Sequence, residues 1–172
     1  MTPVTKSACP GCGLVLPDVD GPTHRYIGAS PACWSLYGAV LATIYVDRER
    51  LRLLQLVVDA YAAQHPGRRS RQAAQSVAIH LMTLCLCLEC GVDPAAGPRL
   101  HRWMVERPRF TWLTPPDERG SRTVRDVAAA RTPAEFEEVV WAWARGVWDA
   151  WSAHHATVRG WLAGLHREAV QL

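Results

Sequence analysis

Two cysteines near the start of the chain have the spacing of a metal-ligand pair. Cys9 and Cys12 lie in the segment CPGCG, with Gly11 and Gly13 beside them. Two intervening residues let both thiolates reach one ion, and the glycines leave backbone N–H groups free to turn toward the sulfurs. The pair therefore predicts half of a zinc knuckle, and a structural zinc needs two further ligands.

The nearest ligands downstream are His24 and Cys33. Cys33 falls in the first turn of a helix expected from Pro31 onward, where the positive end of the helix dipole favours a thiolate. We therefore expect a tetrahedral Zn²⁺ site whose ligands are Cys9, Cys12, His24 and Cys33. A redox CxxC pair would need the strand-then-helix setting of thioredoxin-like proteins, which the sequence does not predict here. Loop thiols without a metal are the simpler alternative.

Four histidines on expected helices form a second group. His80 lies in the most apolar stretch, which should form the central helix, and His65 ends the preceding helix. His154 and His155 lie in a tryptophan-rich helix near the C-terminus. Imidazoles that meet inside a helical bundle build metal sites with open coordination positions, or act as general acids and bases. We expect a second site formed by His65, His80 and either His155 or His154; the alternative is that each is a hydrogen-bonded core histidine.

Geometry limits how these histidines can combine. Along two antiparallel helices His65 and His80 would lie about 15 Å apart, which argues against one shared ion. His101 is expected at the surface near a helix end. The candidate carboxylate partners of the helical histidines are Asp59, Glu89 and Asp149, although a solvated helix face is the simpler interpretation of each.

Two regions of different character must position these residues. Residues 1–31 contain five prolines and little periodicity, so this head needs an external constraint such as a metal. Apolar residues then recur at helical spacing, and strand patterns are limited to short pieces near Val15 and Tyr26. We expect an all-α fold in one domain, 1–172, with a zinc-binding head over 1–31 and a helical bundle over 32–172. The main helices are predicted over 31–46, 47–65, 70–90 and 133–170, with shorter ones within 93–106 and 123–130.

Composition narrows the classes of function. The chain has 172 residues, of which 49% are hydrophobic and 20% charged, as in globular proteins that bury a core without disulfides. Nineteen basic and 16 acidic residues give a net charge of +3, which argues against nucleic acid as a partner. Binding of nucleic acid through the knuckle would need a basic face formed by Lys6, Arg25, Arg68, Arg69 and Arg71.

The cysteines and the apolar segments bear on location. The longest apolar run, residues 77–88, is too short to span a bilayer. Because the N-terminal residues contain no apolar run, we do not expect a secretory signal. We therefore expect a cytoplasmic protein without a membrane partner, whose cysteines are thiols or metal ligands. Cys85, Cys87 and Cys90 do not converge on one helix face and are expected to be small buried hydrophobic residues.

Several segments taken together resemble a family of uncharacterised bacterial proteins. These segments are CPGCGLVLPDVDGPTHRYIGASPACW, DAYAAQHPG, QSVAIHLMTLCLCLE and WDAWSAHHATVRGWL. The family has a CPxCG head, a central QHPG, a helix-borne histidine and a C-terminal tryptophan-rich HH segment. The resemblance implies that the matching positions are Cys9, Cys12, His24, Cys33, His65, His80, His154 and His155. It implies no reaction, and LCLCLEC lies outside the shared pattern.

The leading hypothesis is a zinc protein with a second, histidine-based site. That site would act on a small molecule in a pocket between helices, lined by some of the eight tryptophans, through metal-assisted or general acid–base chemistry. The alternative is a non-catalytic, zinc-braced interaction module whose histidines are structural. A further alternative completes the CxxC pair with bundle histidines and leaves a water position, which would make the knuckle catalytic. We expect four protein ligands, and hence a structural clasp.

Overall fold

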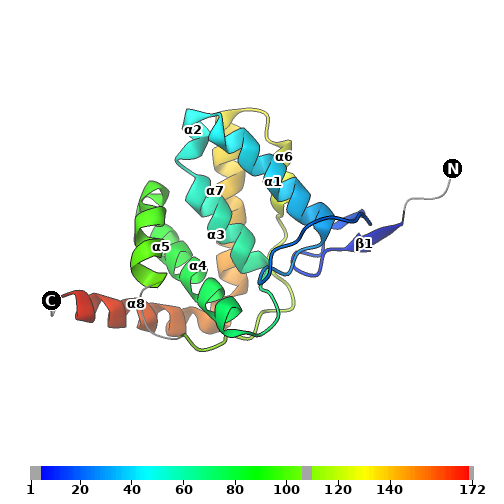
Figure 1. Ribbon diagram of the computed structural model, residues 1–172. Helices are drawn as coiled ribbons and strands as arrows, with labels where there is room; N and C mark the ends of the chain where they lie inside the picture. The colour runs from blue at the N-terminus through cyan, green and yellow to red at the C-terminus, as the bar shows by residue number, and fades with distance from the viewer. Residues whose placement is uncertain (1–4, 106–109, 171–172) are drawn as a thin grey trace.

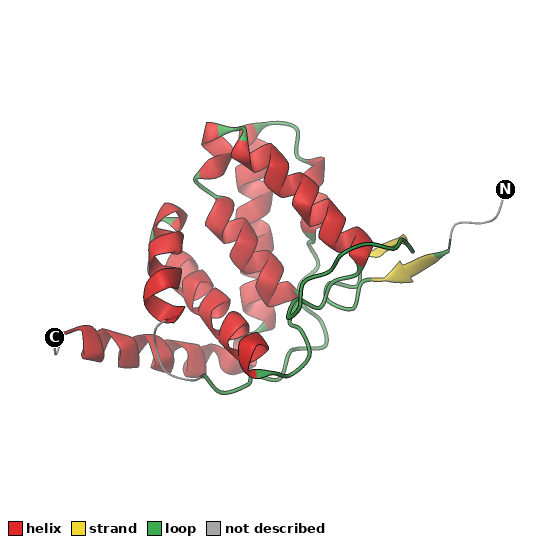
Figure 2. Cartoon of the chain, in the orientation of Figure 1, coloured by secondary structure: helices red, strands yellow, loops and turns green. Residues whose placement is uncertain are grey.

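The computed structural model describes residues 5–105 and 110–170, with side chains described as far as residue 164. Helices dominate these residues, and a short antiparallel hairpin is the sheet found among them (Figures 1 and 2). The all-α prediction is therefore confirmed. In chain order the elements are β1 (Lys6–Ala8), β2 (Val15–Pro17), α1 (Pro31–Tyr45), α2 (Arg48–Leu51), α3 (Leu54–Gln64), α4 (Arg71–Glu89), the 3-10 helix η1 (Pro94–Ala96), α5 (Gly97–Val105), α6 (Val124–Ala129), α7 (Pro133–Ala150), the 3-10 helix η2 (Ser152–His154) and α8 (His155–Val170).

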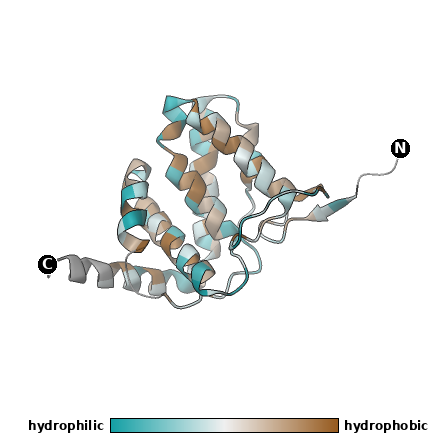
Figure 3. Cartoon of the chain, viewed as in Figure 1, coloured by the Kyte–Doolittle hydropathy of each residue, from teal (hydrophilic) through white to brown (hydrophobic). Residues whose placement is uncertain are grey.

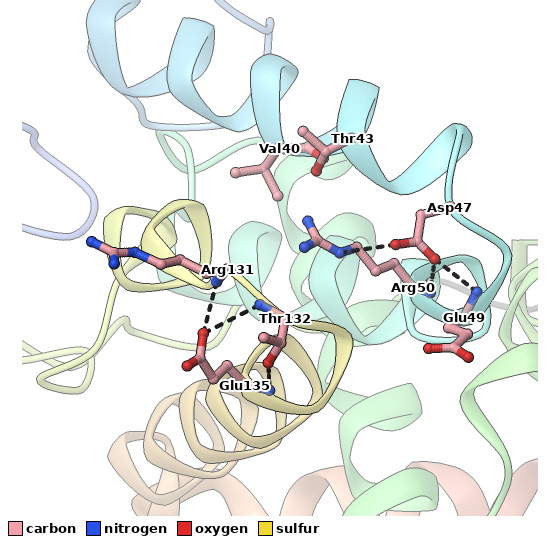
Figure 4. A network of polar contacts seen from close by, with 8 residues as sticks. All are labelled: Val40, Thr43, Asp47, Glu49, Arg50, Arg131, Thr132 and Glu135. Atoms are coloured by element: carbon pink, nitrogen blue, oxygen red, sulfur yellow. Dashed lines mark hydrogen bonds and ion pairs between the residues drawn. The ribbon is translucent and has the colours of Figure 1, made fainter.

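Side-chain caps explain where several helices begin. The Asp47 carboxylate accepts hydrogen bonds from the backbone N–H groups of Glu49 and Arg50 at the start of α2 (Figure 4). At the start of α7 the Thr132 hydroxyl accepts from the N–H of Glu135, whose carboxylate accepts from the N–H of Thr132 (Figure 4). These bonds satisfy N–H groups that have no partner within the helix. Both starts follow the sequence prediction.

The long C-terminal helix is interrupted at Trp151, between α7 and α8. The sequence predicts one helix over 133–170, and the glycines at which it could bend, Gly146 and Gly160, lie inside α7 and α8 instead. The imidazole of His155 stacks on the ring of Trp148, and its Nε2 donates to the Trp148 carbonyl at 2.8 Å. This carbonyl therefore has a side-chain donor at the point where the regular helical bonds end. A contact between side chains, rather than a glycine, marks the break.

Helix α3 is the most enclosed element of the bundle. It packs against α4 and α7, while α1 packs against α6, and α4 also contacts α5 and α8. Its buried residues include the polar side chains Gln55, Asp59 and Gln64 as well as the apolar ones. Gln64 is satisfied by donating to the carbonyls of Arg119 and Arg122 and by accepting from Trp143 Nε1. Buried polar groups on α3 therefore mark where specific interactions, rather than apolar packing alone, organise the core.

The helices of the bundle enclose an apolar core. Figure 3 shows hydrophilic residues at α2 and around the start of α4, and many apolar residues along α1 and α3. Within the described ranges, none of the helices is both long enough and apolar enough to cross a membrane.

Candidate functional site

Three cysteines and one histidine converge where the N-terminal head meets the bundle. Cys9 and Cys12 lie on the turn between β1 and β2, Cys33 lies in the first turn of α1, and His65 directly follows α3. Their sulfur and imidazole nitrogen atoms all lie within 4.8 Å of one another. We name this group the Cys3His cluster. It could hold a metal ion.

The two separations that involve the Cys33 sulfur match those of a tetrahedral site. Cys12 Sγ lies 3.9 Å from Cys33 Sγ, and Cys33 Sγ lies 3.4 Å from His65 Nε2. With zinc bonds of about 2.3 Å to sulfur and 2.0–2.1 Å to nitrogen, tetrahedral geometry requires S–S and S–N separations of about 3.8 and 3.5 Å. Two of the six separations between donor atoms thus have ligand spacing, and the others are no longer than 4.8 Å.

The orientation of His65 suits a ligand. Its Nδ1 lies 2.7 Å from the carbonyl oxygen of Tyr61, which can only accept, so Nδ1 carries the proton. The lone pair of Nε2 then faces Cys33. Hydrogen bonds of this kind fix the tautomer and ring orientation of metal-binding histidines. A backbone N–H from Ser30 also points at the Cys9 sulfur, at 3.4 Å, as expected for a thiolate acceptor.

The electrostatics of the cluster favour a bound cation. Hydrogen bonds from Cys12 and Cys33 lower the pKa of Cys9 below its usual range. Contacts with the Cys12 and Cys9 thiols, together with burial, raise the pKa of Cys33 far above its usual range. For Cys12 the hydrogen bond from Cys33 lowers the pKa, but contact with Cys9 and burial outweigh it and raise the value to about 11. Without a positive ion the group therefore favours one thiolate over three; a divalent metal would stabilise all of them.

The fourth member of the cluster is His65, whereas the sequence pointed to His24. The His24 ring packs edge-on against Tyr26, with ring centroids 4.3 Å apart, and lies beside Trp34. His24 Nδ1 is buried, and no described residue is its hydrogen-bond partner. The nearest histidine in sequence is thus not the nearest in space, because the head folds back on the end of α3.

Close backbone packing brings the head to α3. The N–H of Gly28 donates to the carbonyl of His65 at 2.8 Å, and Ile27 forms an antiparallel bridge with Pro66. Figure 1 shows the head lying against the C-terminal end of α3. A Cβ atom on Gly11 would lie 2.1 Å from the His65 ring, so a side chain at this position is excluded. Gly11 therefore makes room for the His65 ring.

A second group of titratable side chains lies between α3, α4 and α5. Asp59 is fully buried, and its Oδ1 lies 2.7 Å from His80 Nδ1 and 2.9 Å from His101 Nε2. Gln55 Nε2 donates to the same oxygen at 2.9 Å. The sequence pointed to His80, but it suggested a solvated position for Asp59 and a surface position for His101. The sequence signal that could have indicated a buried Asp59 is its i+4 spacing from Gln55, because the two side chains can form a hydrogen bond on one helix face.

Two adjoining cavities lie beside His80. The larger, of about 270 Å³, is lined by His80 and His101 together with residues of α4, α5 and the head. The smaller, of about 160 Å³, is lined by His80, His24, Trp34 and residues of α1 and α3. Both include Tyr26 of the head in their walls. The position of the head therefore shapes the space in front of His80.

The other predicted site residues lie elsewhere. His154 Nε2 donates to the carbonyl of Thr114, and His155 donates to that of Trp148, as described above. Among the described residues neither histidine belongs to a ligand cluster. His65 and His80 belong to separate groups, in line with the spacing argument. The expected single site of His65, His80 and His155 or His154 is therefore not formed.

Three of the eight tryptophans are buried in the core, and the other five are partly buried. Trp143 and Trp151 are fully buried and donate to Gln64 Oε1 and to the Ala63 carbonyl. Of the tryptophans in the described residues, Trp34 is the one that lines a cavity next to His80. A pocket lined by several tryptophans is thus not found at His80. Cys85 and Cys87 are buried, as predicted, whereas Cys90 is exposed.

Comparison with known proteins identifies a family but no activity. The model of a family described as "Family of unknown function (DUF5946)" matches residues 7–152. The match includes both side-chain groups described above and ends before His154 and His155. No curated protein and no solved structure matches the chain.

Proposed function

We propose that this chain, which belongs to the family of unknown function DUF5946, is a zinc protein in which the ion is a structural clasp. The observation that carries the proposal is the Cys3His cluster, whose donor atoms converge within 4.8 Å and whose Cys33 sulfur lies at tetrahedral spacing from Cys12 and His65. Cys9, Cys33 and His65 are almost completely buried, and four protein ligands leave a tetrahedral ion no open position. Such a closed site favours a structural role for the ion over a catalytic one.

The donor set favours zinc among the common metals. Three thiolates and one imidazole form a soft, tetrahedral environment, which Zn²⁺ occupies in many structural sites. Calcium and magnesium require oxygen ligands instead. A reducing compartment such as the cytoplasm suits the proposal, because the thiols must stay reduced to bind the ion.

The clasp would have a consequence beyond local stability. It would fasten the head to the end of α3, and the head contributes Tyr26 and His24 to the cavity walls beside His80. We therefore propose that the zinc site shapes a pocket for a small molecule.

The contacts of His80 favour a role in binding or converting a small molecule over a purely structural role. Full enclosure of His80, without a neighbouring cavity, would have made catalysis at this residue untenable. Instead His80 lines two cavities, and its Nδ1 is held by the buried carboxylate of Asp59 at 2.7 Å. A carboxylate in this position orients an imidazole for general acid–base chemistry or for metal binding. These contacts support an enzyme that acts on a small molecule.

Cobalt substitution tests the clasp. Co²⁺ bound by thiolates has intense sulfur-to-metal charge-transfer absorption, which oxygen and nitrogen ligands do not give. We expect this absorption in the wild-type chain and its loss in the Cys9→Ser/Cys12→Ser double variant. We expect His24→Ala to retain it, because His24 lies outside the cluster. Cys87→Ser is the matched control for loss of a buried thiol.

Zinc content and melting temperature complete the test. The wild-type chain should hold zinc and lose thermal stability when a strong chelator removes it. The Cys9→Ser/Cys12→Ser variant should melt lower and respond less to the chelator. Undiminished cobalt–thiolate absorption in the double variant, with unchanged melting, would refute the clasp.

A further inference from the structure

We propose that Asp59, His80 and His101 form a second metal site, which binds a divalent transition-metal ion and presents open coordination positions to the larger cavity. The inference goes beyond the zinc clasp and stands on different residues. Each donor comes from a different helix, α3, α4 and α5. Their ligand atoms lie within 4.8 Å of one another. We name this group the aspartate–histidine cluster.

The strongest indication is a buried carboxylate oxygen without a hydrogen-bond partner in the described part of the chain. Asp59 is fully buried, and its Oδ2 has no hydrogen-bond partner among the described residues. The arginine ion pairs found in the described ranges do not include Asp59. A buried polar oxygen without a partner is unfavourable, because its lost hydration is not replaced. A divalent ion would neutralise the charge and use the free lone pairs of the carboxylate.

The distances accommodate an ion. Asp59 Oδ1 lies 2.7 Å from His80 Nδ1 and 2.9 Å from His101 Nε2. With metal bonds of about 2.1 Å, ligand atoms at right angles lie about 3.0 Å apart, and at tetrahedral angles about 3.4 Å. Small rotations of the side chains would therefore admit the metal. Two imidazoles and one carboxylate are a ligand set of zinc enzymes and of non-haem iron(II) sites.

Access to solvent distinguishes this group from the Cys3His cluster. The side chains of His80 and His101 are 15% and 20% exposed, whereas Asp59 lies behind them with no exposure. Both histidines line the cavity of about 270 Å³, and Asp59 does not. An ion held by these three residues would thus have its remaining positions toward the cavity. Three protein ligands with an open position are typical of catalytic rather than structural metals.

The cavity indicates what the open positions would bind. Tyr26, Gln72 and Ser76 supply polar groups to its wall, beside the apolar side chains of Ile79 and Val105. The ion would carry water, and a small molecule with an oxygen or nitrogen donor could displace that water. The Gln55 amide on α3 would hold the Asp59 carboxylate in place, because its Nε2 donates to Asp59 Oδ1 at 2.9 Å.

Metal titration of the zinc-loaded, full-length chain tests the proposal. Loosely bound metal is first removed by brief chelation, and Co²⁺ is then added while heat and visible absorption are measured. We expect one further equivalent to bind without new sulfur-to-metal absorption. Asp59→Asn and His101→Gln should each raise the Kd by at least about tenfold. His155→Gln should leave it unchanged, because this imidazole donates to a backbone carbonyl outside the cluster.

Several results would overturn the proposal. These are the absence of a further equivalent at millimolar Co²⁺, an unchanged Kd in both variants, or histidine NMR signals that show His80 and His101 protonated around a metal-free carboxylate at neutral pH. If Asp59→Asn does not fold, the partly exposed His101 still provides the test. The cobalt–thiolate absorption reports on the zinc clasp separately, so failure of one site is distinguishable from failure of the other.

Discussion

At the scale of single residues, His65 connects the N-terminal head to the bundle. One imidazole nitrogen donates to the Tyr61 carbonyl, and the other faces Cys33 at 3.4 Å. The ring also stacks on the Tyr61 ring, with centroids 4.0 Å apart. These contacts hold the imidazole in the orientation of a ligand before any ion binds. Preorganisation of this kind lowers the entropy lost when a metal is bound.

The space beside His65 gives a sharp residue-level prediction. In Gly11→Ala the new Cβ would lie 2.1 Å from the His65 ring and 2.7 Å from the Gly28 carbonyl oxygen. The backbone oxygen cannot move without shifting the head. We expect loss of about 1–3 kcal/mol in the free energy of unfolding, measured with denaturant, and weaker metal binding.

Gly38 provides the control for this substitution. It lies in α1 and has no described atom within 4 Å of an added Cβ. Gly38→Ala should therefore keep the metal and gain about 0.5–1 kcal/mol of stability from helix propensity. If Gly11→Ala is as stable as Gly38→Ala and binds metal equally well, the assigned packing around His65 is wrong.

Some site residues could be predicted from sequence, and the reason is local spacing. Cys9 and Cys12 are two residues apart, and Cys33 lies at a helix start that the preceding Ser-Pro pair marks. His65 could not be assigned, because it reaches the cysteines through long-range backbone pairing between Ile27 and Pro66. Such pairing leaves no periodic signal in the sequence.

At the scale of elements, a surface network joins three helices. Glu89 at the end of α4 receives two hydrogen bonds from the Arg159 guanidinium of α8, each of 2.8 Å. It also accepts from Trp148 Nε1 of α7 at 2.9 Å. Bidentate pairs of this kind are the stronger ion pairs, although exposure to solvent limits their energy. The network fixes the position of α8 against the bundle.

This network predicts a pH-dependent stability. The Arg159 guanidinium, assisted by Trp148, lowers the pKa of Glu89 to about 2. A folded-state pKa below the unfolded value means that the stabilisation is complete above about pH 5 and is lost as the pH falls toward 2. Because the pair is largely exposed, we expect Glu89→Gln to lower the free energy of unfolding by less than about 1 kcal/mol at pH 7.

Denaturant unfolding at several pH values measures this effect. The difference between wild type and Glu89→Gln should shrink as the pH is lowered from about 5 to about 2. The control is Glu138→Gln on the exposed surface of α7, which should show a smaller difference at pH 7. A difference for Glu89→Gln that grows toward low pH would contradict the assigned network.

The elements themselves were predictable to different degrees. The starts of helices at Asp47, Ser70 and Thr132 follow from capping residues, and the structure has caps at all three. The breaks at Leu53 and Trp151 were not predicted. Apolar periodicity continues across both breaks, so local sequence gives little warning of them. At the second break the rings of Trp148 and His155 stack because the chain folds there, and local helix propensity does not predict this contact.

At the scale of the whole molecule, the two clusters differ in their access to solvent. The Cys3His cluster is enclosed between the head and the bundle, and the aspartate–histidine cluster faces a cavity whose wall includes the head. Fastening of the head would thus shape the approach to the second group. The sequence suggested two sites but mixed their members, because helical position alone does not show that α5 brings His101 to α3 and α4.

The most direct test of the central claim is a crystal structure of metal-loaded protein with an anomalous difference map at the zinc edge. The account predicts a strong peak equidistant from the sulfurs of Cys9, Cys12 and Cys33, with His65 Nε2 as the fourth ligand. Expected bond lengths are about 2.3 Å to sulfur and 2.0–2.1 Å to nitrogen. A disulfide between these cysteines, an ion bound by His24 in place of His65, or no peak at this position would contradict it.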